Sequence, residues 1–133
     1  MKSIDVVAAI ICREGRVLAT QRGYGDFVGG WEFPGGKVEA GELPEEAVVR
    51  EIREELDVAI GVDSLLVTVD HDYNTFHLHM CCYVAHIEEG HPHLLEHCAA
   101  KWLGANTIDS VGWLPADVKV VEAIKGSGIL SSS

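Results

Sequence analysis

The segment Pro44–Leu56 constrains the fold of this 133-residue chain more than any other part of it. Proline is well tolerated in the first turn of a helix, where its missing N–H group costs nothing. The apolar residues that follow recur at helical spacing and form one stripe: Ala47, Val48, Ile52 and Leu56. We therefore predict a helix over residues 44–56 whose apolar stripe is buried against a second layer of structure.

Apolar runs on both sides of this helix predict the strands of that second layer. The runs cover residues 6–12, 16–22, 62–69, 76–87 and 101–103, and residues 31–33 form a short extended stretch that ends at residues 34–36. Residues 115–125 predict a closing helix with Val118, Val121 and Ile124 facing the core. Strands interleaved with two helices indicate one α/β domain over residues 1–126, followed by a disordered tail over residues 127–133.

The charge of the chain excludes several kinds of partner. Lysine and arginine total 10 and aspartate and glutamate total 21, which gives a net charge of −11. Such a chain repels nucleic-acid backbones and anionic lipids, and no apolar run approaches the roughly 20 residues that a membrane helix needs. We expect no nucleic-acid polymer and no membrane as partner, and we expect a divalent cation beside any polyanionic substrate.

The cysteines and the N-terminus indicate a cellular compartment. The four cysteines have neither the spacing of a zinc site nor that of a disulfide framework: Cys12, Cys81, Cys82 and Cys98. The first residues lack the cleavage site of a secretory signal. We expect reduced, mostly buried thiols in a cytoplasmic protein.

The predicted helix and its flanks also carry most of the acidic excess. Between Glu39 and Asp57 there are eight acids against two arginines. Glu51, Glu54 and Glu55 are spaced i, i+3 and i+4, so they share one helix face on which like charges repel. This face is either a solvated acidic surface or a site for hard divalent cations, which prefer carboxylate oxygens.

The spacing of these residues resembles the Nudix box, the signature of the Nudix hydrolase family. It runs Gly36, five residues, Glu42, seven residues, Arg50-Glu51-Ile52-Arg53-Glu54-Glu55, one residue, Asp57-Val58. Six fixed residues at ordinary usage would meet by chance about once in ten million start positions. The family has glycine where this chain has Asp57, at a helix end that favours a left-handed residue. Aspartate tolerates that conformation at a cost of about 1 kcal/mol, so we expect little effect on the chemistry.

The resemblance extends over nearly the whole chain. Residues 31–39 are similar to the MutT-type nucleotide pyrophosphohydrolases, and residues 6–11, 77–79, 96–97 and 114–117 resemble the CTP pyrophosphohydrolase branch of that group. The resemblance implies a Nudix α/β/α sandwich with a mixed β-sheet between helices. It also implies hydrolysis, dependent on Mg²⁺ or Mn²⁺, of a nucleoside triphosphate to the monophosphate and pyrophosphate. CTP, dCTP or an oxidised nucleotide such as 8-oxo-dGTP would be the substrate, and the last would give the protein a role in DNA repair.

The family's motif also assigns metal and catalytic roles. Glu51, Glu54 and Glu55 would be metal ligands and the catalytic carboxylates, and Gly36 or its neighbour Gly35 would offer a backbone carbonyl. Glu96 fits a further metal ligand on a later loop, against the alternative of a plain exposed acid. Arg50, with Glu42, would orient the loop and the helix through a salt bridge.

Four residues are candidates for substrate binding by the same resemblance. Arg22 and Lys37 would contact phosphates, although either can equally be a surface charge. Asp117 falls where MutT has an asparagine that reads the base, and a carboxylate there accepts hydrogen bonds from an exocyclic amine. The alternative is that Asp117 caps the start of the last helix or stabilises it by its charge. Phe76 stands where MutT has an arginine that helps bind oxidised guanine nucleotides, which weakens a strictly oxidised-guanine substrate.

Other ring-bearing residues fit the site less specifically. Three aromatic residues can stack on a base or serve only in packing: Phe27, Phe33 and Tyr73. His77 and His79 share one strand face without an evident third metal ligand, which favours pocket lining or core. The remaining histidines of this region are expected in a loop: His91, His93 and His97.

Three alternatives to a triphosphate pyrophosphohydrolase stay open at this point. One is a Nudix hydrolase of ADP-ribose or dinucleoside polyphosphates. Another is a non-catalytic nucleotide sensor, which predicts damaged box glutamates, whereas all are intact here. The third is an acidic interaction module, which does not require the spacing of Gly36 and Arg50. The chain can be a monomer or a homodimer.

Overall fold

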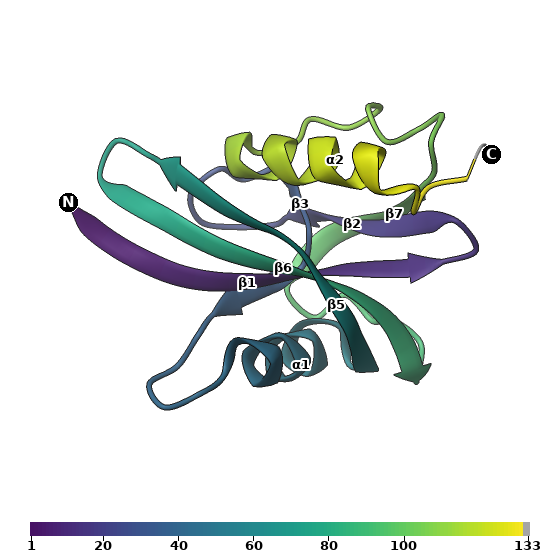
Figure 1. Cartoon of the computed structure of the whole chain (residues 1–133), viewed down its shortest axis with the longest axis horizontal. Coiled ribbons are helices and arrows are strands. Elements are labelled where there is room, and N and C mark those ends of the chain that lie inside the picture. Colours follow the sequence, from purple (N-terminus) through teal and green to yellow (C-terminus); the bar gives the residue numbers. More distant parts are fainter. Residues whose placement is uncertain (132–133) are drawn as a thin grey trace.

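The computed structural model describes residues 1–131, which form a mixed sheet with one helix on each side (Figure 1). The elements in chain order are β1 (Lys2–Arg13), β2 (Arg16–Arg22), β3 (Trp31–Glu32), β4 (Gly35–Lys37), α1 (Pro44–Leu56), β5 (Ala59–Asp72), β6 (Phe76–Glu89), β7 (His97–Leu103) and α2 (Pro115–Ser127). The sheet order is β3-β2-β1-β6-β5, with β4 paired to β1 and β7 paired to β2. The β1–β6 pair is parallel and the other pairs of named strands are antiparallel, so the predicted α/β/α sandwich with a mixed sheet is confirmed.

Strand β1 is apolar at successive positions because both of its faces are buried. Ala8 and Ile10 belong to the core under α2, whereas Val7, Ala9 and Ile11 belong to the core under α1. The four residues of the predicted apolar stripe of α1 are all fully buried in the core under α1. The central strand therefore holds the two helical layers on one rigid frame.

Helix α1 begins and ends as the sequence predicts. Pro44 follows the N-cap residue Leu43, whose N–H donates to the Glu46 side chain at 2.9 Å. The helix ends at Asp57, which adopts the left-handed conformation with φ 56° and ψ 40°. Its backbone N–H donates to the Arg53 carbonyl, which closes the last turn at 3.1 Å.

Several predicted boundaries differ from the structure. Residues 35–37 form strand β4 rather than a break, because glycine lets this segment approach β1: a Cβ atom on Gly35 would meet the Val7 carbonyl oxygen at 1.9 Å. Strands β5, β6 and β7 are longer than predicted. In α2, Val120 is buried in the core. Val118, which was predicted to face the core, is 48% exposed, so that prediction was wrong.

The C-terminal residues also differ from the predicted tail. Helix α2 continues to Ser127, and Ile129 and Leu130 pack on the core under α2. The Ser131 N–H donates to the Gly15 carbonyl at 2.9 Å. These two apolar side chains beyond the helix are therefore partly buried. Residues 132 and 133 lie outside the described residues.

We expected mostly buried thiols and no membrane as partner. All four cysteine thiols are free; Cys82 is buried, Cys12 and Cys81 are half-buried, and Cys98 is exposed. Neither helix of this part of the chain has the length and apolar character needed to cross a membrane.

Candidate active site

A cavity of about 460 Å³ opens where β1, the glycine-rich loop after β2, the end of α1, the β5–β6 turn and the start of α2 converge. Its volume lies within the usual range for small-molecule sites. Carboxylates and aromatic rings both line it. The cavity therefore offers charged and apolar surfaces to one ligand.

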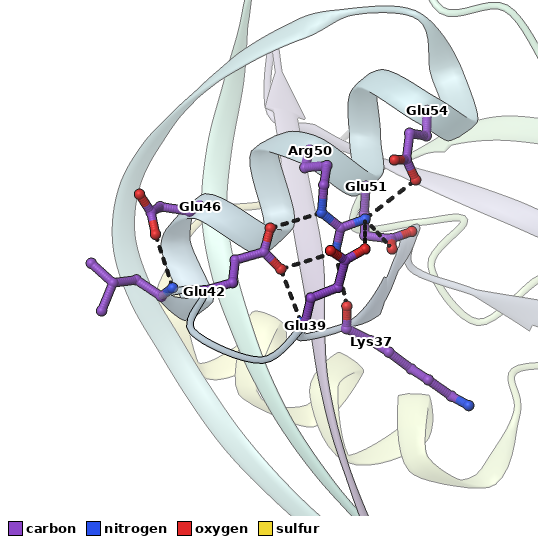
Figure 2. A network of polar contacts seen from close by, with 8 residues as sticks. Lys37, Glu39, Glu42, Glu46, Arg50, Glu51 and Glu54 are labelled. Carbon is purple, nitrogen blue, oxygen red and sulfur yellow. Dashed lines mark hydrogen bonds and ion pairs between the residues drawn. The ribbon is translucent and has the colours of Figure 1, made fainter.

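Arg50 is the centre of the polar network beside this cavity (Figure 2). Its Nε and Nη2 atoms hold both carboxylate oxygens of Glu42, at 2.7 and 3.0 Å. Its Nη1 atom donates to Glu51 at 2.8 Å and to Glu54 at 3.3 Å, and Nη2 also donates to the Lys37 carbonyl at 3.0 Å. The predicted salt bridge between Glu42 and Arg50 is thus present, and it ties the loop after β4 to α1.

The same network sets the ionisation of Glu42. The hydrogen bonds from Arg50, and a further bond from the Glu39 N–H at 3.0 Å, lower the pKa of Glu42 to about 2. Glu42 therefore stays ionised across the physiological range and remains a fixed partner for Arg50.

Glu55 is the buried acid of this helix, with 4% of its surface exposed. Burial, together with the nearby charges of Glu51, Glu96 and Glu32, raises its pKa to about 9. Burial also raises the pKa of Glu51. These shifts show that several carboxylates face one another in a poorly solvated place.

The predicted metal ligands lie at different depths. Glu55, Glu96 and Gly36 line the cavity. A Cβ atom on Gly36 would come within 2.3 Å of a Glu51 carboxylate oxygen, so glycine is required for this approach. Glu54 is more exposed and is turned toward Arg50 (Figure 2).

These residues fit a divalent cation in charge and in donor type. Carboxylate and carbonyl oxygens are the donors that Mg²⁺ and Mn²⁺ prefer, and a cation would offset the repulsion that raises the pKa of Glu55. Among residues 1–131, no three acidic, cysteine or histidine side chains already form a ready-made coordination group.

Glu32 and His97 also belong to the site, although neither was predicted from the sequence to be a site residue. Glu32 holds Arg22 by a two-pronged contact, with Arg22 Nη2 at 2.5 Å and Nε at 3.3 Å. Burial acts to raise the pKa of Glu32, but the close approach of His97 and the hydrogen bonds from Arg22 outweigh it and lower the pKa. Arg22 also donates to the Asp26 carbonyl at 2.9 Å and lines the cavity, and its contact with phosphate stays a prediction.

The prediction of His97 as a loop residue is wrong. It is the first residue of β7, its side chain is only 6% exposed, and it lines the cavity. Its Nε2 atom lies 3.6 Å from Glu32 and 4.0 Å from Glu55. Its Nδ1 atom is buried and finds no hydrogen-bond partner within residues 1–131. In the sequence, the only signal for His97 as a site residue was its position beside Glu96, in the segment 96–97 that resembles the CTP pyrophosphohydrolase branch.

Asp117 is a buried acid in the wall of the cavity, with 6% of its surface exposed. Its Oδ1 atom accepts a hydrogen bond from the Phe33 N–H at 3.0 Å. Burial raises its pKa to about 7 despite that bond. Leu114 is the N-cap residue of α2, so Asp117 does not cap the helix, although it lies in the first turn.

Aromatic rings from two segments form another wall of the cavity. The Tyr73 and Phe76 rings stack with centroids 5.0 Å apart, and Phe27 of the glycine-rich loop lies 5.4 Å from Tyr73. Phe33 also borders the cavity, but it is buried and stacks on Trp113, so its main role is in packing.

Lys37 and the histidine pair are not brought into the cavity. The Lys37 side chain points away from the network, and only its carbonyl contacts Arg50 (Figure 2). His77 and His79 were expected to line the pocket or to enter the core, and this was wrong. They lie partly exposed beside Asp70 and Asp72, because the longer β5 pairs with them there.

Comparison with known proteins agrees with this architecture. Residues 6–123 match the family described as NUDIX domain. The chain is 37% identical over 126 residues to the CTP pyrophosphohydrolase of Escherichia coli K12, covering 92% of each protein. It is 34% identical over 125 residues to the 8-oxo-dGTP diphosphatase of Haemophilus influenzae, again covering 92% of each.

Solved structures give the same result. The solution structure of the E. coli ORF135 protein superposes with a TM-score of 0.82 at 35% identity, covering 95% of this chain and 91% of that one. The crystal structure of a MutT NUDIX hydrolase from Burkholderia pseudomallei superposes with a TM-score of 0.85 at 32% identity, covering 93% and 99%.

Proposed function

This chain belongs to the NUDIX domain family, and from that membership we propose that its cavity is the active site of a nucleoside triphosphate pyrophosphohydrolase. The products are the nucleoside monophosphate and pyrophosphate. The observation that carries the proposal is that one cavity joins a carboxylate cluster around Glu55 to an aromatic wall with a buried acid, Asp117. The first can serve a phosphate chain and the second a nucleobase.

Glu55 and Glu96, which line the cavity, would hold Mg²⁺ or Mn²⁺ together with the Gly36 carbonyl. Glu51, whose carboxylate lies against Gly36, and Glu54 on the same helix face are further proposed ligands. When bound, such a cation neutralises the phosphate chain and polarises the phosphorus atom under attack. Arg50 is proposed to position the acids without touching the substrate. Its contacts with Glu42, Glu51 and the loop carbonyl fix the positions of the acids.

Proton transfer falls to the carboxylates of α1. An attacking water must give up a proton, and a carboxylate within reach can accept it. Glu51 and Glu55 are the proposed acceptors, because burial raises the pKa of both carboxyls and makes their ionised forms stronger bases. Glu55, with a pKa of about 9, would accept a proton only where a bound cation keeps it ionised.

Arg22 is the proposed phosphate contact from the chain itself. It lines the cavity, and Glu32 and the Asp26 carbonyl hold its guanidinium in one orientation. A fixed guanidinium matches the geometry of phosphate oxygens better than a free one. Lys37 lacks such a placement, so the phosphate contact rests on Arg22.

Cytidine triphosphates are the substrate class that Asp117 favours. An ionised carboxylate accepts a hydrogen bond from the exocyclic amine of cytosine, which uracil lacks. Tyr73 and Phe76 supply rings on which the base can stack. An oxidised purine triphosphate is the second candidate, because protonated Asp117 also offers a donor and because one similar protein is named 8-oxo-dGTP diphosphatase.

A panel of nucleotides tests this proposal. CTP, dCTP, UTP, ATP, GTP, 8-oxo-dGTP and ADP-ribose are incubated with Mg²⁺ or Mn²⁺, and monophosphate and pyrophosphate release is measured. We expect turnover of triphosphates with pyrophosphate as product and with cytidine substrates among the best. Faster turnover of ADP-ribose than of any triphosphate, or no turnover at all, would overturn it.

A further inference from the structure

The end of the β5–β6 hairpin has two different faces. Tyr73 and Phe76 line the cavity, whereas their neighbours Asp72 and His77 are cross-strand partners and form the last pair before the turn. Side chains of successive strand residues point to opposite faces. The Asp72–His77 pair therefore lies behind the aromatic wall, outside the cavity.

His77 makes two short contacts with carboxylates of β5. Its Nδ1 atom lies 2.6 Å from Asp72 Oδ1, and its Nε2 atom lies 2.9 Å from Asp70 Oδ1. Ionised carboxylates only accept hydrogen bonds, so both ring nitrogens can donate only when the imidazole carries its second proton. Protonated His77 thus links both acids, and neutral His77 loses one of the two bonds.

The hairpin end determines where the aromatic wall stands. The Tyr73 N–H donates to the Phe76 carbonyl at 2.9 Å across the turn. The Tyr73 hydroxyl accepts a hydrogen bond from the Ala116 N–H at 3.3 Å, directly beside Asp117 in the chain. A shift of the turn would therefore change the position of both rings relative to the acid that faces the base.

We propose that His77 is a positioning residue that fixes the β5–β6 turn through Asp72 and Asp70, so that Tyr73 and Phe76 are held ready for the nucleobase. It does not touch the substrate. This inference rests on the proposed nucleotide pocket and adds to it a structural control on base binding. Loss of the His77 contacts is expected to weaken nucleotide binding more than it slows the chemical step.

The contacts of His77 depend on pH. The titratable and charged groups around it come from four elements: Asp70 and Asp72 of β5, His79 of β6, Asp5 of β1 opposite His79, and Lys119 of α2 on the Asp70 carbonyl. The hydrogen bonds that His77 donates to Asp72 and Asp70 raise its pKa. The link is therefore complete below the ordinary pKa of 6.5 and is lost as the pH rises through the raised value.

The chain provides a matched control on the same two strands. His86 pairs with Asp63 of β5, with Nδ1 at 2.9 and 3.0 Å from the two carboxylate oxygens. This pair lies at the opposite end of the hairpin and does not line the cavity. His86→Gln removes a similar histidine–aspartate pair without affecting the turn.

The kinetic test compares His77→Gln, Asp72→Asn and His86→Gln with the unchanged protein, using CTP and Mg²⁺ at pH 6.5. For the first two we expect KM to rise by about fivefold or more with kcat within about twofold, and for His86→Gln no change in either. As the pH is raised into the alkaline range, KM should rise in the unchanged protein and in His86→Gln. The rise should be smaller in His77→Gln. Equal effects of His77→Gln and His86→Gln on KM, or no effect of either, would overturn the proposal.

Amide hydrogen exchange gives a readout that needs no substrate. The Tyr73 amide is expected to exchange faster in His77→Gln than in His86→Gln, and faster in the unchanged protein at alkaline pH after correction for the intrinsic rate. If no nucleotide is hydrolysed but this exchange responds, the proposed function fails and the positioning role stands. If nucleotides are hydrolysed but neither exchange nor KM responds, the positioning role fails alone. Should His77→Gln not fold, Asp72→Asn and the pH series of the unchanged protein decide the question.

Discussion

A carboxylate oxygen of Glu55 lies 4.0 Å from Nε2 of His97, and both side chains are almost completely buried. This contact brings the last turn of α1 next to the first residue of β7, two segments far apart in the sequence. It places an acid with a strongly raised pKa where the surrounding residues offer little positive charge.

Replacing Glu55 with Gln should reduce turnover strongly and stabilise the metal-free protein. Turnover should fall at least about 100-fold, because a main electrostatic group of the site is lost. The raised pKa of Glu55 means that its contribution to stability is present below 4.5 and is lost as the pH rises through about 9. Glutamine carries no charge, so the variant should have the higher Tm in EDTA at pH 8.

The matched control for this prediction is Glu122→Gln, which removes an exposed glutamate on α2. It should leave both turnover and Tm near those of the unchanged protein. A folded Glu55→Gln variant with nearly unchanged turnover would count against the site, and a lower Tm at pH 8 would contradict the electrostatic argument.

Arg50→Lys should reduce turnover although the charge is kept. Lysine cannot hold both oxygens of Glu42 and reach Glu51 at the same time, because it lacks the planar fork of arginine. We expect a loss of about tenfold or more in kcat/KM. Arg53→Lys on the same helix is the control, since the Arg53 side chain is exposed and has no part in this network. Similar kinetics for the two variants would show that the network does not position the acids.

Asp117 should make the choice between cytosine and uracil depend on pH. Its pKa is raised to about 7, so it is mainly protonated at pH 6 and mainly ionised at pH 8. The ionised form accepts from the cytosine amine, whereas the protonated form can donate to the uracil carbonyl. The ratio of kcat/KM for CTP to that for UTP should rise between these pH values, and Asp117→Asn should flatten the rise while the Mg²⁺ dependence stays unchanged. A ratio that follows the same curve in both proteins would remove Asp117 from the base site.

The sequence predicted best where local chemistry decides the structure. Pro44 and the apolar stripe specify α1 by themselves, and its bounds are confirmed. The stripe of α2 was misplaced because neighbouring valines fit a helical period almost equally well. Only the packing of α2 against the sheet selects Val120 over Val118.

Long-range pairing explains most of what the sequence did not predict. Asp70 and Asp72 lay beyond the predicted strand over residues 62–69, but their cross-strand contacts with His77 and His79 extend β5. Glu32 and His97 were missed as partners because each is a single residue, and their significance depends on a fold that brings β3 next to β7 and α1. The box residues were recognisable because their spacing is local to one loop and one helix.

Asp57→Gly should stabilise the protein without changing its activity. Asp57 ends α1 in the left-handed conformation, with φ 56° and ψ 40°, which costs a residue with a Cβ atom roughly 1 kcal/mol and costs glycine little. The backbone N–H bond to the Arg53 carbonyl is kept in the variant. We expect a higher denaturant midpoint with an unchanged slope, whereas Asp57→Ala should lower the midpoint because alanine tolerates this conformation less well than aspartate. CTP turnover should be the same in all three proteins, since Asp57 does not line the cavity. A midpoint for Asp57→Gly below that of the unchanged protein would mean that the side chain of Asp57 contributes more through its neighbours, such as His93 at 3.9 Å, than the backbone conformation costs.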